Sequence, residues 1–210
     1  MNDSLASTPK CPPGLGYLTQ IDHLMVKERV HFLAPNDTFT VKNSAGQNIY
    51  WATEEPNCCA RGSFGASRPF DVKIMNIQSQ EVMYFYRRIG VGYRDSIEVS
   101  APLGKVIGRV KEDWSFLNHS FTVKNHENTP VLRIEAPFFK SSPFGDAEFK
   151  ILLMDGTQIG RISKKWAGLA RELADGHYYG IAFPLELDVR MKAVLLGACI
   201  MLNSRFYERL

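Results

Sequence analysis

Residues 121–134 have the sequence FTVKNHENTPVLRI, in which two alternating apolar stretches flank a polar centre. Alternation of apolar and polar side chains is typical of a β-strand with one buried face, and Asn and Pro favour the turn that reverses a hairpin. This segment is therefore predicted to form two antiparallel strands joined by a short turn.

The same pattern occurs in four further segments. They are FTVKNSAGQNIYWA (39–52), FDVKIMNIQSQEVMYFYR (70–87), IEVSAPLGKVIGRV (97–110) and FKILLMDGTQIGRI (149–162). Five hairpins correspond to about ten strands. Because exposed sheet edges promote aggregation, we expect a mainly β structure that closes into a barrel or a sandwich.

Two segments differ from the hairpin pattern. Residues 164–174, KKWAGLARELA, combine good helix formers with spaced apolar residues, which predicts a short helix. Residues 189–202, VRMKAVLLGACIML, are apolar without a break from Ala193 onward, but a membrane span needs about twenty such residues. A short helix that is apolar on all sides is most simply buried in protein, so we expect residues 190–202 to fill the barrel. A membrane-inserted tail is the alternative.

The composition is that of an ordinary intracellular domain. The 210 residues are 45% hydrophobic and 22% charged, which suffices for one domain with a sizeable core. The net charge of +3 suits an anionic lipid surface but is too small to indicate nucleic-acid binding. The N-terminus has no signal-peptide pattern, so we expect reduced cysteines. Residues 1–16 are predicted to be a flexible segment before a single domain over 17–210.

Motifs for catalysis are missing from the sequence. It contains no G-x-S-x-G, no H-E-x-x-H, no phosphate-binding glycine loop and no CxxC pair, so we expect neither an enzyme nor a zinc site. Several basic residues are candidates for contacting anionic lipid headgroups, because each such residue near a charged leaflet contributes about 1 kcal/mol. These candidates are Arg87, Arg88, Arg94, Lys164 and Lys165.

The sequence resembles the phospholipid scramblase family over residues 11–207. The stretches that carry the resemblance are CPPGLGYLTQID (11–22), NCC (57–59), SRPFDVKI (67–74), GRISKKWAGLARE (160–172) and GIAFPLELDVRMKAVLLGACIM (180–201). The resemblance implies the tubby C-terminal fold, a closed antiparallel barrel of about twelve strands around a central hydrophobic helix. It also implies calcium-activated, ATP-independent movement of phospholipids between leaflets, at the cytoplasmic face of the plasma membrane.

The resemblance also implies a site of lipid attachment and a nuclear-import segment. The family's acylated cysteine run corresponds to residues 86–99, which contain no cysteine. Cys58 and Cys59 are therefore the candidate acylated pair, and two buried, inert thiols are the alternative. The import segment aligns with residues 163–168, which makes Lys164, Lys165 and Trp166 candidate importin contacts; simply solvated lysines are the alternative.

The family's calcium segment corresponds to DGHYYGIAFPLE, residues 175–186. Its candidate ligands here are Asp175, His177, Tyr179 and Glu186. Imidazole and phenol replace two of the oxygen ligands usual in such a loop, so weak binding is expected. The residues from Tyr179 to Leu187 also alternate in polarity, with Leu185 on the apolar face that a strand would bury, and an extended strand cannot wrap one ion. We favour the strand and keep the calcium loop as the alternative.

Two functional hypotheses follow. The leading one is a protein that moves phospholipids without transforming them, with calcium as the regulator. The alternative is a tubby-like adaptor that docks on anionic lipids or partner proteins without transporting lipid, and that also has a nuclear role. A closed barrel with its apolar helix inside offers no path across a hydrocarbon core about 30 Å thick. Transport would therefore require that the helix leaves the barrel, that the protein forms an oligomer, or that the membrane becomes thinner locally.

Overall fold

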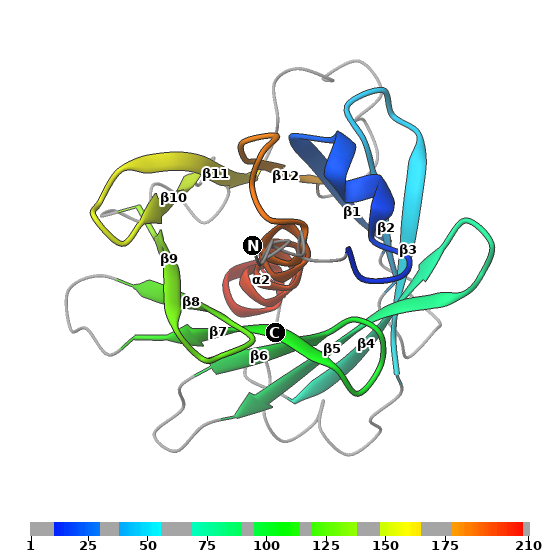
Figure 1. Ribbon diagram of the computed structural model, residues 1–210, viewed down its shortest axis with the longest axis horizontal. Coiled ribbons are helices and arrows are strands. Elements are labelled where there is room, and N and C mark those ends of the chain that lie inside the picture. Colours follow the sequence, from blue (N-terminus) through cyan, green and yellow to red (C-terminus); the bar gives the residue numbers. More distant parts are fainter. Residues whose placement is uncertain are drawn as a thin grey trace, which may run out of the picture.

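Twelve strands close into one antiparallel barrel around a single long helix in the described part of the chain (Figure 1). The computed structural model describes residues 11–29, 38–55, 69–89, 95–113, 119–137, 148–164 and 178–207. The elements are η1 (Gly16–Gln20), β1 (His23–Arg29), β2 (Thr38–Lys42), β3 (Asn48–Glu54), β4 (Phe70–Asn76), β5 (Glu81–Ile89), β6 (Asp95–Ser100), β7 (Val106–Glu112), β8 (Ser120–Asn125), β9 (Pro130–Glu135), β10 (Glu148–Leu153), β11 (Gln158–Lys164), β12 (Tyr178–Ala182) and α2 (Val189–Tyr207).

The strands follow one another around the barrel in chain order, and β1 pairs with β12 to close it. All five predicted hairpins are present, as β2–β3, β4–β5, β6–β7, β8–β9 and β10–β11. The closed, mainly β barrel expected from the sequence is therefore confirmed. Of the predicted helix over 164–174, Lys164 is the last residue of β11, and the rest lies outside the described residues.

A shared device makes three of the hairpin turns. An asparagine follows or ends the first strand, and its side-chain Oδ1 accepts backbone N–H groups two and four residues later. Asn43 accepts from Ala45 and Gln47 at 3.1 and 2.9 Å. Asn76 accepts from Gln78 and Gln80 at 3.0 Å each. Asn125 accepts from Glu127 and Thr129 at 3.0 and 2.9 Å. Local chemistry therefore sets these turns.

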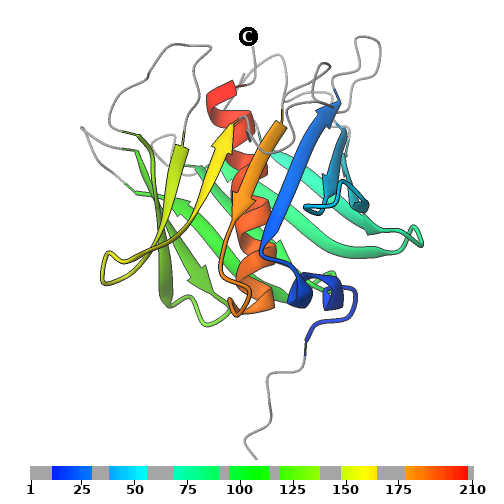
Figure 2. The ribbon, with the colours of Figure 1, turned by 90° about the horizontal axis from the view of Figure 1, so that it is seen from above.

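The helix α2 runs along the inside of the barrel (Figure 2). Its residues from Met191 to Ser204 are all buried, and its glycine at position 197 lets it approach β6. A Cβ added at Gly197 would lie only 2.8 Å from Cγ2 of Val99. The predicted burial of the apolar helix in the barrel is confirmed. None of the helices in the described residues is both long and apolar enough to cross a membrane.

The helix continues beyond the point where its apolar stretch ends. The sequence predicts a buried helix over 190–202, with the polar residues after Leu202 as an interruption. Asn203 and Ser204 are instead buried members of α2, 2% and 3% exposed. The hydroxyl of Ser204 accepts a hydrogen bond of 2.7 Å from Nη1 of Arg87 on β5, which explains why a polar residue is tolerated there.

The first described residues are packed against the barrel. Leu15 is fully buried, and the hydroxyl of Tyr50 on β3 donates to the carbonyl oxygen of Gly14 at 3.1 Å. The phenol oxygen of Tyr17 also accepts a hydrogen bond of 2.7 Å from Asn43. Residues 11–16 therefore differ from the flexible segment predicted for 1–16, because Leu15 covers one end of the core.

Because α2 is buried, we expect the thiol of Cys199 on this helix to be unreactive. Burial raises the pKa of the Cys199 thiol far above its usual range, whereas Cys11 is only partly buried. Because the thiolate is the reactive form, iodoacetamide is expected to spare Cys199 in the folded protein and to modify it on unfolding in urea. Mass spectrometry of digested samples measures both thiols. Rapid labelling of Cys199 under native conditions would contradict the enclosed helix.

Candidate anion-binding site

A basic groove of about 320 Å³ lies on the outer wall of the barrel, across β5 to β8. Four basic side chains and one acidic side chain line it, which makes three net positive charges. These charged residues are Arg88, Arg109, Lys111, Lys124 and Glu98. They point outward because the residues alternating with them, such as Val110 and Val123, face the core.

The strand register sets the geometry of this groove. Arg88 of β5 lies opposite Ser96 of β6, which in turn lies opposite Lys111 of β7. Neighbouring strands are about 4.8 Å apart, so Arg88 and Lys111 flank the small Ser96 at about 10 Å between backbones. Both long side chains can lean over the serine toward one anion. A phosphate suits this arrangement, since guanidinium groups bind phosphate oxygens in pairs.

A second row of side chains lies beside the first. Tyr86, Glu98, Arg109 and Lys124 are opposite one another on successive strands. Nε of Arg109 is 2.9 Å from a carboxylate oxygen of Glu98, which neutralises this pair. The guanidinium of Arg88 lies over the Tyr86 ring, 5.0 Å from its centre. Arg88, Lys111 and Lys124 have no carboxylate partner within the described ranges, so they supply the attraction for an anion.

Arg87 does not belong to this surface, contrary to the prediction that it contacts headgroups. It is fully buried on the inner face of β5, opposite Phe70 and Ile97, and its guanidinium lies 5.3 Å from the centre of the Phe70 ring. Alternation explains the difference, because Arg87 continues the inward-facing series of Met83 and Phe85. Its guanidinium interacts with Phe70 and Ser204 inside the barrel.

The other predicted headgroup residues lie elsewhere. Lys164 ends β11 opposite Tyr179 of β12, on the inward-facing side of the strand and away from the groove. Arg94 and Lys165 lie outside the described residues, as do Trp166 of the predicted import segment and the predicted acylation residues Cys58 and Cys59. Among the predicted residues that the structure describes, Arg88 alone lines the groove. Arg109 and Lys111 were missed, although their spacing of two residues on one strand places them on one face.

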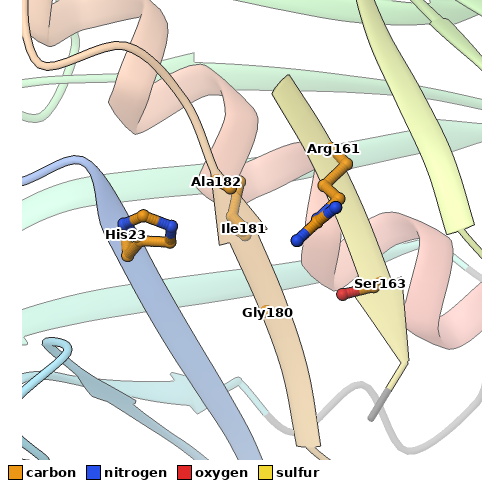
Figure 3. A pocket seen from close by; sticks show the side chains of 6 residues that line it. All are labelled: His23, Arg161, Ser163, Gly180, Ile181 and Ala182. Carbon is orange, nitrogen blue, oxygen red and sulfur yellow. The ribbon is translucent and has the colours of Figure 1, made fainter. Parts of the chain in front are cut away.

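A smaller depression lies over β12, between His23 of β1 and Arg161 and Ser163 of β11 (Figure 3). It exists because Gly180 and Ala182 present almost no side chain there. Its volume of about 10 Å³ suits a single water molecule. Asp22 is 2.7 Å from His23, and the hydrogen bond between them lowers the pKa of Asp22. With its histidine already held by a carboxylate, this depression is a poor anion site.

The predicted calcium residues are only partly described, and those described do not meet. Tyr179 lies in β12, which is extended between β1 and β11 (Figure 3), and its side chain faces inward. Glu186 lies in the turn after the strand, where the Leu187 N–H donates to the Pro184 carbonyl at 3.1 Å. Tyr179 and Ala182 alone are separated by about 10 Å of extended chain. Tyr179 and Glu186, which lies beyond Ala182, are therefore not placed to bind one calcium ion together.

The structure also limits the predicted strand. It ends at Ala182 rather than continuing in alternation to Leu187, and Leu185, expected on its buried face, is 49% exposed. Pro184 ends the pairing, since proline has no N–H to donate to a neighbouring strand. Asp175 and His177 lie outside the described residues. In those described, there is no group of three His, Cys, Asp or Glu residues placed to hold a metal ion.

These observations define a closed barrel with an enclosed helix and a basic groove on its outer wall. The model of the Scramblase family matches residues 1–209, and the chain therefore belongs to that family. Phospholipid scramblase 1 of Rattus norvegicus is 38% identical over 213 residues, covering 95% of this chain and 64% of that protein. Phospholipid scramblase 2 of Bos taurus is 39% identical, covering 94% of this chain and 72% of that protein.

A more distant relative covers still more of the chain. Phospholipid scramblase family member 5 of Homo sapiens is 31% identical, over 98% of this chain and 81% of its own length. The chain thus spans somewhat less than two thirds of the rat relative. No solved structure matches the chain.

Proposed function

We propose that this protein moves phospholipids between the leaflets of a membrane without transforming them, and that the basic groove contacts their phosphate groups. Membership of the Scramblase family supports the class of activity. The observation that supports phosphate binding in the groove is the row of side chains in which Arg88 and Lys111 flank the small Ser96. On this proposal the protein attaches to the cytoplasmic face of a membrane containing anionic lipid.

Removing two charges from the groove is expected to weaken vesicle binding. Each basic residue near an anionic surface contributes about 1 kcal/mol, so Arg88→Gln with Lys111→Gln should lower the affinity about 30-fold. Sedimentation with phosphatidylserine-containing vesicles measures this at low and moderate salt. The control is Lys42→Gln with Lys150→Gln, which removes the same charge from β2 and β10. Equal losses in both double variants would show a merely diffuse attraction and contradict the groove.

Transport is tested with the same proteins in liposomes that carry a fluorescent phospholipid. The assay measures how much of the probe becomes accessible to an impermeant quencher, with and without calcium. Faster equilibration with wild-type protein, and slower equilibration with the groove variant, is the expected result. No acceleration by folded, vesicle-bound protein would contradict transport.

A second candidate function is docking on anionic lipid without transport. The observation that favours it is the enclosed helix, whose apolar surface is used up inside the barrel. On this alternative, vesicle binding depends on Arg88 and Lys111 as above while lipid equilibration stays at the rate of empty liposomes. The two assays therefore separate the two functions.

Calcium regulation belongs to the proposal as well, although Tyr179 and Glu186 do not form a shared site. Calorimetric titration of wild-type protein, Asp175→Ala and Glu186→Ala distinguishes a local site from an indirect effect. Acylation at Cys58 and Cys59, and importin binding through Lys164, Lys165 and Trp166, stay predictions for mass spectrometry and binding assays.

A further inference from the structure

Lys192, in the first turn of α2, is fully buried and ties together three parts of the chain. Its ammonium donates to the carbonyl oxygens of Leu18 at 2.9 Å, of Ile21 at 2.7 Å and of Leu185 at 2.7 Å. An ammonium has three N–H groups, so these contacts use all of them. They join the helix to η1, to the segment before β1, and to the turn after β12.

The position of this lysine is unfavourable on two counts. A cation near a helix N-terminus opposes the helix dipole, and burial disfavours the charged form. Burial accordingly lowers the pKa of Lys192, while the carboxylates of Asp22 and Glu186 act in the opposite direction. The three hydrogen bonds, together with the attraction to these two carboxylates, offset the cost. Glu186, predicted as a calcium ligand, thus lies where it supports Lys192 electrostatically.

The other end of the helix is held by a buried cation from the barrel wall. Nη1 of Arg87 donates to Ser204, twelve positions after Lys192 and therefore about 18 Å along the helix axis. Between the two ends, Gly197 lies against Val99 of β6. A helix that slid by one position would bring a larger side chain against Val99, so the packing opposes sliding.

We propose that α2 stays inside the barrel while the protein is bound to a membrane, held by Lys192 and by Arg87, and that lipid is contacted along the outer wall. This inference rests on the proposed membrane function. It contrasts with a mechanism in which the helix leaves and its apolar surface enters the bilayer.

A disulfide between the helix and the wall tests this inference. Val99→Cys with Gly197→Cys joins β6 to α2 where a Cβ at position 197 comes within 2.8 Å of the Val99 side chain. The native thiols are removed by Cys11→Ser, Cys58→Ser, Cys59→Ser and Cys199→Ala. Oxidation is expected to give the same disulfide yield in solution and on phosphatidylserine vesicles. The oxidised protein should also bind vesicles as well as the reduced protein does.

A disulfide that forms in solution but not on vesicles would overturn the inference. So would loss of vesicle binding or of lipid equilibration on oxidation, with recovery on reduction. If wild-type protein fails to accelerate lipid equilibration, the proposed transport fails, while the disulfide yield on vesicles still decides where the helix lies.

A second measurement uses wild-type protein, so it does not depend on substitutions in the core. Cys199 lies in the middle of α2 and is fully buried. Its alkylation by membrane-permeant N-ethylmaleimide is expected to be as slow on vesicles as in solution. Marked acceleration on vesicles would show that the helix leaves its enclosure, even if the double-cysteine variant does not fold.

Discussion

Replacement of Lys192 by methionine is expected to lower the free energy of unfolding by about 3–5 kcal/mol. Methionine fills a similar volume but leaves the carbonyls of Leu18, Ile21 and Leu185 without their shared donor. It also removes the electrostatic attraction between the ammonium and the carboxylates of Asp22 and Glu186. A domain is stable by only about 5–15 kcal/mol, so the loss should be obvious.

Urea unfolding followed by circular dichroism measures this effect. The control is Lys105→Met, the same change at an exposed lysine in the turn between β6 and β7, which should alter stability by less than about 0.5 kcal/mol. If the free energy of unfolding of Lys192→Met were within about 1 kcal/mol of the wild-type value, the three hydrogen bonds would contribute no more than burying the charge costs. Lys192 would then not hold the helix.

Replacement of Arg87 by methionine should destabilise the fold by about 2–3 kcal/mol. The change removes the donor to Ser204 and the guanidinium over the Phe70 ring, both inside the barrel. The neighbouring Arg88→Met is a matched control, because it removes the same side chain one residue later on the outward face. It should change stability by less than about 0.5 kcal/mol.

Vesicle binding should show the opposite order for these two variants. Arg88→Met is expected to lower the affinity for anionic vesicles about fivefold, whereas folded Arg87→Met protein should bind as wild type. Urea unfolding and sedimentation with vesicles measure the pair side by side. If Arg87→Met weakened vesicle binding while leaving stability unchanged, the buried position of its side chain would be wrong.

The hairpins could be predicted because their causes are local. Alternation decides which side chains share a face, and asparagines such as Asn43, Asn76 and Asn125 make the turns through their own neighbours. The length of the apolar stretch before Asn203 likewise identifies an enclosed helix. The same alternation contains the information that separates Arg87 from Arg88, since only Arg87 continues the inward series of Phe85.

The groove could not be predicted as a unit. Arg88, Lys111 and Lys124 are separated by more than ten residues each, and only the register of β5 to β8 brings them together. Register between strands depends on which side chains pack in the shared core, and this is a property of the whole barrel. The sequence therefore identified a mildly basic surface but not the residues that concentrate its charge.

The sequence by itself determined the five hairpins, the enclosed apolar helix and the family, because each depends on residue order over short distances. The tertiary structure alone decided what Lys192 does. Its partners are backbone carbonyls of Leu18, Ile21 and Leu185, and every residue has such a carbonyl. No pattern of side chains marks those three, so the contact exists only once the barrel closes around the helix.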